Sequence, residues 1–169
     1  MAYACVRTDN MSGTKNPTDL VSVKYQVSGT DTAIENGNVV LVGAKATGER
    51  EARLATAPAA NSALADVALI ASPELLRDER MHNLDEFINA AGELARGYRF
   101  KSSNYFSITA EAFEASATVA VGDVVELQAK TKFKVVAAAT GLTSGSTQVG
   151  NIYAIETVGA KTYYVVEVI

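Results

Sequence analysis

Ile34-Glu35-Asn36-Gly37-Asn38-Val39-Val40-Leu41-Val42 is the stretch that decides the fold, because the sequence uses its pattern twice. The counterpart is Val119-Ala120-Val121-Gly122-Asp123-Val124-Val125-Glu126-Leu127, which lies 85 positions later. In each copy, a glycine followed by Asn or Asp predicts a turn, because glycine adopts positive φ without steric cost and Asx side chains bond their own backbone. The Val-Val pair that follows predicts a strand, since β-branched residues fit a pleated sheet.

The match extends beyond this core at the same offset and without a gap. Leu20–Gln26 aligns with Tyr105–Glu111, and Ala65–Ile70 aligns with Gly150–Ile155. Identities are few, but the apolar positions keep one register, and a slip of one residue would invert every strand face. We interpret the repeat as two small, similar β-barrel or β-sandwich units. The alternative is chance recurrence of short Gly-Asx-Val-Val strands in an alanine- and valine-rich chain.

The segment between the two units carries apolar residues at helical spacing. They are Leu84, Phe87, Ile88, Ala91 and Ala95, which recur at i, i+3, i+4, i+7 and i+11. Asn83 and Glu86 are placed to form a capping box, and Gly97 is a natural stop. The pattern predicts an amphipathic helix at about 84–96 that joins the two units.

The predicted fold class is therefore mainly β with one central amphipathic helix (α+β). We divide the chain into an N-terminal arm (1–19), a first β unit (20–72), a charged segment with the helix (73–103) and a second β unit (104–169). The loop-like composition of the arm is compatible with disorder, with packing on its own body, or with contact to a neighbour. The last strand, at 162–168, is apolar on both faces, which predicts that both faces are covered.

Composition restricts the partners. The chain has 169 residues and a formal charge of −4 without a run of Lys and Arg, which argues against nucleic acid. No basic and apolar leader opens the sequence, and no apolar stretch approaches the roughly 20 residues of a membrane span. Cys5 is the one cysteine, so no intramolecular disulfide forms. We expect synthesis in a reducing cytoplasm and no membrane contact.

A search for catalytic motifs finds none that is complete. His82 is the one histidine, so the usual nitrogen and sulfur ligands of a metal site cannot be assembled with Cys5 alone. Ser12-Gly13-Thr14-Lys15 matches S-x-x-K, but the companion motifs of those enzymes are missing. Gly43–Gly48 has the glycine spacing of a phosphate loop, but Glu49 follows where lysine is required. We predict that the protein is not an enzyme and has no cofactor or metal.

Several stretches across nearly the whole chain carry a family resemblance. They are Met1–Asp9 with Met11–Thr14, Leu20–Tyr25, Ile34–Gly43, Asn83–Asn89 with Arg96–Arg99, and Ala154–Val166. On these stretches the chain resembles the small head decoration (capsid-stabilising) proteins of tailed bacteriophages, especially those of Firmicutes phages. That family has no active-site residues to carry over.

The resemblance implies a structural virion protein that binds the outer surface of the capsid and stabilises the expanded head. The implied partner is the major capsid protein, with a homo-oligomer on the capsid as a further expectation. The implied location is the virion surface, after synthesis in the host cytoplasm. We expect the capsid contact to include Tyr3, Val6 and Arg7 of the arm. Arg77 and Arg80 belong either to this contact, seeking carboxylates on the partner, or to a solvated surface segment.

Two other classes stay open at this point. The first is another phage structural protein, of the head-completion or tail-tube kind, which differs from a decoration protein in copy number per virion. The second is a surface carbohydrate-binding or adhesion module. The absence of Trp and the few Phe and Tyr lower its weight, because such modules usually expose aromatic side chains in a groove.

Overall fold

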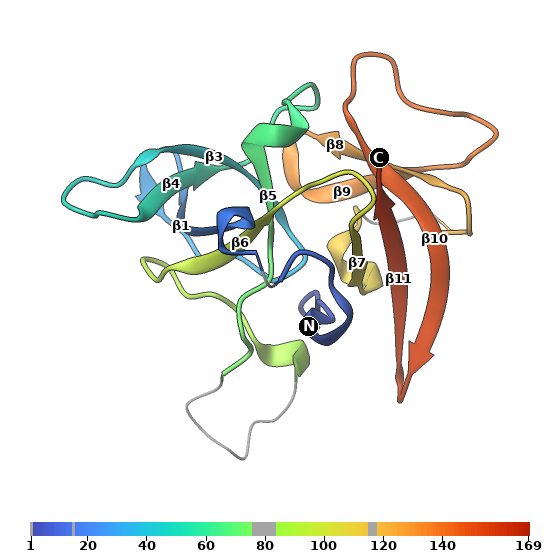
Figure 1. The fold of residues 1–169 in the computed structure, drawn as a ribbon, viewed down its shortest axis with the longest axis horizontal. Coiled ribbons are helices and arrows are strands. Elements are labelled where there is room, and N and C mark those ends of the chain that lie inside the picture. Colours follow the sequence, from blue (N-terminus) through green and yellow to red (C-terminus); the bar gives the residue numbers. More distant parts are fainter. Residues whose placement is uncertain (1, 15, 76–83, 115–117) are drawn as a thin grey trace.

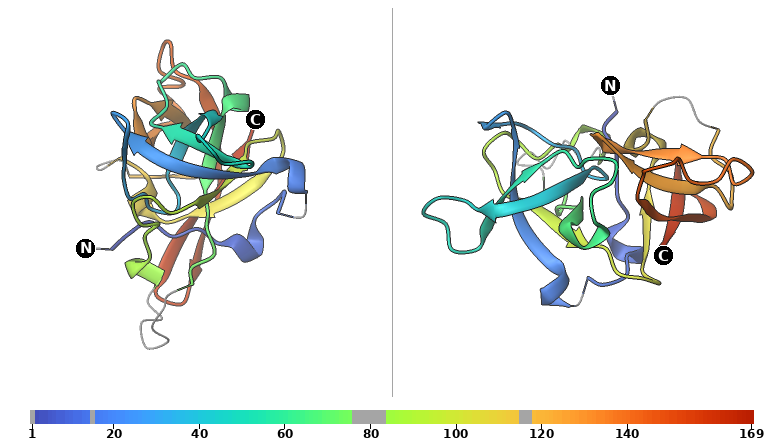
Figure 2. Two further views of the ribbon diagram at one scale, coloured as in Figure 1. Left: turned by 90° about the vertical axis from the view of Figure 1, so that its left-hand side faces the viewer. Right: turned by 90° about the horizontal axis from the view of Figure 1, so that it is seen from above.

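The computed structural model of the chain describes residues 2–14, 16–75, 84–114 and 118–169. These residues form two β-sheets joined by loops and by short 3-10 turns. Figure 1 shows the strands of the first sheet beside those of the second, with β5 between them and the N-terminal end of the chain near the junction. The two perpendicular views in Figure 2 show the same division. The 3-10 turns are η1 (Thr8–Asn10), η2 (Pro17–Asp19), η3 (Leu64–Asp66), η4 (Leu84–Glu86) and η5 (Ala110–Ala112).

The first sheet closes into a five-stranded barrel. Its strands are β1 (Leu20–Val27), β3 (Val39–Lys45), β4 (Ala52–Thr56), β5 (Val67–Ile70) and β6 (Ala95–Arg99), and the short β2 (Thr30–Asp31) pairs with the end of β1. Closure occurs because β1 pairs with β4 in parallel and with β6 in antiparallel orientation. Small and β-branched side chains fill the interior: Val23, Ile34, Val40, Ala55, Ile70 and Ala95.

The second sheet has five strands in the order β7-β11-β10-β8-β9. The bounds are β7 (Tyr105–Ile108), β8 (Val124–Gln128), β9 (Lys130–Val136), β10 (Gln148–Val158) and β11 (Lys161–Val168). Beyond the end of β7, Phe113 forms an isolated parallel bridge with Phe133 of β9. The segment that follows β7 therefore lies beside β9, which is the third strand of this sheet in chain order.

The two sheets share one strand order once β2 is set aside. Numbered along the chain within each sheet, the strands lie in the order third, second, fourth, fifth, first. In the first sheet the first and third strands pair in parallel over several residues, whereas the second sheet has the single bridge described above.

The repeated Gly-Asx turn has the same local hydrogen bonds in both sheets. The Gly37 amide donates to the Ile70 carbonyl over 2.7 Å, and the Ile70 amide donates to the carbonyl of Asn38 over 2.8 Å. In the second sheet, Gly122, Ile152 and Asp123 make the same two bonds at 2.8 and 2.9 Å. The counterpart of Ile70 is therefore Ile152, and the ungapped alignment of Ile70 with Ile155 is wrong by three residues. Both glycines have positive φ, +79° and +93°, as the repeat predicts.

The largest core cluster lies between the sheets rather than inside either one. Alternate residues of β5 divide between the two cores: Ile70 faces the barrel interior, while Val67 and Leu69 join the shared cluster. All four residues of β5 are therefore buried, which is the pattern of a strand covered on both faces. Phe106 and Phe133 of the second sheet stack at 5.9 Å between ring centroids within this shared cluster.

The predicted central helix at 84–96 is wrong. Only Leu84–Glu86 form a 3-10 turn, and Ala95–Arg99 form strand β6, which closes the barrel between β5 and β1. Gly92 has a φ of +82°, which a right-handed helix does not accommodate. Asn89, which is buried, pairs with Ile34 through both backbone and side chain. The segment predicted to join two β units thus contributes a strand to the first sheet.

Most of the predicted strands are confirmed within a few residues at each end. Apolar alternation bounded by turn residues predicts strands at 20–27, 38–46, 123–129 and 149–157 as well as at 162–168, and these correspond to β1, β3, β8, β10 and β11. The prediction that the last strand is covered on both faces is confirmed, since Tyr163, Val165, Val166 and Val168 are buried.

Gly37 provides a test of the junction between the sheets. An added Cβ there would lie 3.1 Å from the Cβ of Ala112 and 3.3 Å from that of Ala4. Gly122 has a similar φ but nothing within 4 Å of the same position, which makes it a matched control. We expect Gly122→Ala to cost about 1 kcal/mol of backbone strain, and Gly37→Ala to cost a further ~1–3 kcal/mol from overpacking. Urea denaturation of both variants measures the difference, and equal costs would contradict the tight junction.

Candidate functional site

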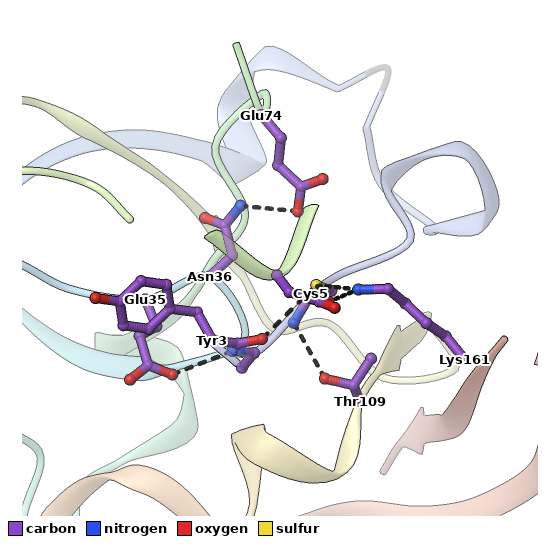
Figure 3. Close-up of polar contacts among 9 residues, drawn as sticks. Tyr3, Cys5, Glu35, Asn36, Glu74, Thr109 and Lys161 are labelled. Atoms are coloured by element: carbon purple, nitrogen blue, oxygen red, sulfur yellow. Dashed lines mark hydrogen bonds and ion pairs between the residues drawn. The ribbon is translucent and has the colours of Figure 1, made fainter. Parts of the chain in front are cut away.

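The N-terminal arm packs on its own body, which decides among the three arrangements left open by its composition. Val6 bridges Ile108 in antiparallel orientation, and the Arg7 amide donates to the Ser107 carbonyl over 3.0 Å. The Thr109 amide donates to the Cys5 carbonyl over 3.1 Å, and the Cys5 amide donates to Thr109 Oγ1 over 3.1 Å (Figure 3). The arm therefore extends the second sheet at the edge of β7.

Of the predicted contact residues of the arm, Tyr3 and Val6 serve the fold directly. The Tyr3 amide donates to the Asp85 carbonyl over 2.9 Å, and the Tyr3 side chain is half-buried. Val6 is 6% exposed and belongs to the shared core, so it presents almost no surface to a partner in this conformation.

Arg7, the third predicted contact of the arm, reaches across the second sheet. Its guanidinium pairs with Asp9 at 2.8 Å and with Glu156 at 3.1 Å, and it lies 5.9 Å from the ring centroid of Tyr163. The hydrogen bond from Arg7 holds the pKa of the Asp9 carboxyl below its ordinary value. Arg7 is thus a clamp between the arm and β10, with a fifth of its side chain exposed (21%).

Arg77 and Arg80, the other two predicted contact residues, lie outside the described residues, as does His82. Their assignment to a partner contact stays a prediction.

A polar cluster that the sequence did not reveal surrounds Cys5. Lys161, at the start of β11, donates from Nζ to Cys5 Sγ over 3.2 Å (Figure 3). It also forms an ion pair with Asp85. The Cys5 thiol lies 3.6 Å from Asp85 Oδ1. The cluster joins three segments that are far apart in the sequence, and a pocket of about 240 Å³ opens beside Asp85 and Lys161.

Burial governs the protonation of this cluster. Burial raises the pKa of the Cys5 thiol above its ordinary value of 9.0, and the Lys161 ammonium offsets only part of that increase. Burial also raises the pKa of the Glu74 carboxyl, which accepts a hydrogen bond from Asn36 Nδ2 over 3.4 Å. A neutral, buried thiol is a poor nucleophile, so the arrangement holds the arm in place rather than activating Cys5.

Two kinds of feature are absent from the described part of the chain. Within it, no group of three or more His, Cys, Asp and Glu side chains is placed to hold a metal ion. Likewise, none of its helices has the length and apolar character needed to cross a membrane.

The outer half of β10 combines an open strand edge with exposed apolar side chains. Strand β8 pairs with β10 only as far as Asn151, so that one edge of 153–158 has no strand beside it among the described residues. Three large apolar side chains of this half are exposed: Tyr153 (59%), Ile155 (42%) and Val158 (47%). An unpaired edge with apolar side chains is suited to strand addition by another chain.

Sequence reasoning missed this surface and the Cys5 cluster for different reasons. Cys5 and Lys161 lie 156 positions apart, and nothing in the sequence pairs them. The exposed half of β10 did have a signal, because Tyr153 and Ile155 continue an apolar strand pattern beyond the part that the neighbouring strands cover.

Comparison with known proteins gives no relative. No family model, curated protein or solved structure matches the chain.

Because of Cys5, we expect the free energy of unfolding to decrease as the pH becomes alkaline. Because folding raises the pKa of this thiol, the folded state retains its proton longer, and stability falls as pH rises through the ordinary value of 9.0. We expect the free energy of unfolding to fall more steeply from about pH 8 to about pH 10 in the unmodified protein than in Cys5→Ser. Urea titrations at several pH values measure the two slopes. Parallel slopes would contradict the burial of a neutral thiol.

Proposed function

We propose that the protein is a structural virion protein that binds the outer surface of a phage capsid and stabilises the expanded head. The resemblance carried by stretches such as Ile34–Gly43 and Ala154–Val166 supports the class, and the major capsid protein is the partner it implies. The observation that carries the proposal is the outer half of β10, at Tyr153–Val158, which has three exposed apolar side chains and one edge with no strand beside it among the described residues. It gives the chain a surface suited to joining another protein.

The geometry of the β10–β11 ribbon suits attachment to another protein. The β10–β11 ribbon is held at its base by β7 and β8, and Arg7 anchors its outer half by pairing with Glu156. A paired ribbon loses less conformational entropy on binding than a disordered segment does, so weak contacts repeated over a shell would give stable attachment.

The duplicated architecture belongs to the same proposal. We infer that the two sheets are similar units built on one plan, supported by the shared strand order and by the matching hydrogen bonds at Gly37 and Gly122. Such a chain offers two related surfaces to a symmetric shell, and a homo-oligomer on the capsid remains part of the proposal.

Binding to capsids tests the proposal directly. Heads of the parent phage that lack this protein are mixed with the purified chain, sedimented, and analysed for bound copies. We expect saturable binding at hundreds of copies per head. About a dozen copies would instead indicate a head-completion role, since connector rings have low closed symmetry. Binding to host-cell glycans without binding to heads would indicate the adhesion class.

The contact surface is tested by a charge placed on the ribbon. Ile155→Lys puts an ammonium beside the open edge of β10, a device that natural sheets use to prevent strand addition. We expect about thirtyfold weaker binding to heads, which corresponds to the roughly 2 kcal/mol of an interface hot spot. Leu142→Lys is the matched control, because Leu142 is equally exposed at 43% but lies in the loop between β9 and β10. Equal binding by the two variants, both folded, would contradict the assignment.

A further inference from the structure

A basic groove crosses the outer surface of the first barrel. It has a volume of about 530 Å³ and runs over β1, with the β3–β4 hairpin on one side and β6 on the other. Its lining contains five cations and one carboxylate: Lys45, Arg50, Arg53, Arg96, Arg99 and Glu51. This concentration of positive charge lies on a protein whose formal net charge is −4.

The cations of the groove are set apart by their lack of acidic partners. Within the described residues, ion pairs hold six basic side chains, and all six lie outside the groove: Arg7, Lys24, Lys101, Lys130, Lys134 and Lys161. None of the five groove cations makes such a pair in the same part of the chain. Of the six described basic side chains that have no ion pair, five therefore lie at this one surface, and the sixth is Lys132 on β9.

The groove is also partly pre-organised. Arg53 donates to the Gly43 carbonyl over 3.0 Å, and Arg99 donates to the Ala65 carbonyl over 2.7 Å, so both guanidinium groups are oriented by the backbone. Lys45, Arg50 and Arg96 are exposed and have their donors available to a ligand. Four guanidinium groups near one another suit carboxylates, which they bind through paired N–H donors.

We propose that this groove binds an acidic segment of a partner polypeptide. Leu20 and Val21, both partly buried, contribute apolar surface to the lining, which suits a peptide backbone with its side chains better than a phosphodiester chain. The inference goes beyond the proposed function and does not depend on it, because it concerns a different surface from the β10 edge and needs no capsid.

Fluorescence anisotropy with a labelled peptide of alternating Glu and Ser tests the proposal. We expect saturable binding that weakens as salt increases, and no binding of the matching Gln and Ser peptide. Arg50→Gln and Arg96→Gln should each weaken binding about fivefold, the upper range for an exposed ion pair, and their effects should multiply. Both side chains are exposed, so thermal unfolding should be unchanged.

Lys132→Gln is the matched control, because Lys132 is the one other described basic residue without an ion pair and lies outside the groove, on β9. Three results would overturn the proposal: no binding of the Glu and Ser peptide, an equal loss of affinity in Lys132→Gln, or tighter binding of a single-stranded DNA of equal charge. Since capsid binding is measured separately, failure here leaves the proposed function standing, and the converse also holds.

Discussion

The structure depends on one hydrophobic contact, the packing of the two sheets and the N-terminal arm into a single core. Val67 and Leu69 reach this core from the barrel, Phe106 reaches it from the second sheet, and Ala4 and Val6 reach it from the arm. Five-stranded sheets of this size bury little apolar surface alone, and sharing one core raises the buried fraction of both. The arm is therefore an interior element of the fold.

This constraint explains why the turn at Gly37 has no room for a side chain while its counterpart Gly122 does. The first turn lies against Ala4 and Ala112, where arm, barrel and second sheet meet, whereas the second has no neighbour within 4 Å of an added Cβ. Asn36, in the first copy, also donates to the Ser72 carbonyl and accepts from the Ser72 amide. Val121 occupies the matching position in the second copy and is exposed. One local motif has thus taken an interior role in one sheet and a surface role in the other.

Most strands could be predicted from the sequence because the patterns that indicate them are local. Alternation, β-branched pairs and Gly-Asx turns each depend on a few neighbouring residues, and the predicted segments match β1, β3, β8, β10 and β11 closely. The helix prediction was wrong because it rested on the local spacing of Leu84, Phe87 and Ile88, which is compatible with a helix. The barrel closes only if the end of this segment, Ala95–Arg99, forms a strand. A Cβ added at Gly97 would lie 3.0 Å from the side chain of Val21 on β1. Gly97 is therefore a strand residue where two strands approach closely, and it does not end a helix. Tertiary context overrode local propensity there.

The surfaces with functional potential were the least predictable part. A net charge of −4 with no basic run concealed the groove, because Lys45, Arg50, Arg53, Arg96 and Arg99 come from separate elements that meet only in the fold. The packing of the arm could not be predicted either, since composition alone does not distinguish an arm that reaches a neighbour from one that fills the core of its own chain. Charge and burial became informative only after the strands were placed.

Native-state hydrogen exchange tests the shared core most directly. The amides of Arg7 and Thr109, which bond across the junction of arm and β7, are compared with the amide of Leu127 in the core strand β8. If the arm is an interior element, the opening free energies of Arg7 and Thr109 lie within about 2 kcal/mol of that of Leu127. If Arg7 exchanges with an opening free energy near zero while Leu127 stays protected, the arm is a frayed terminus and the account is wrong.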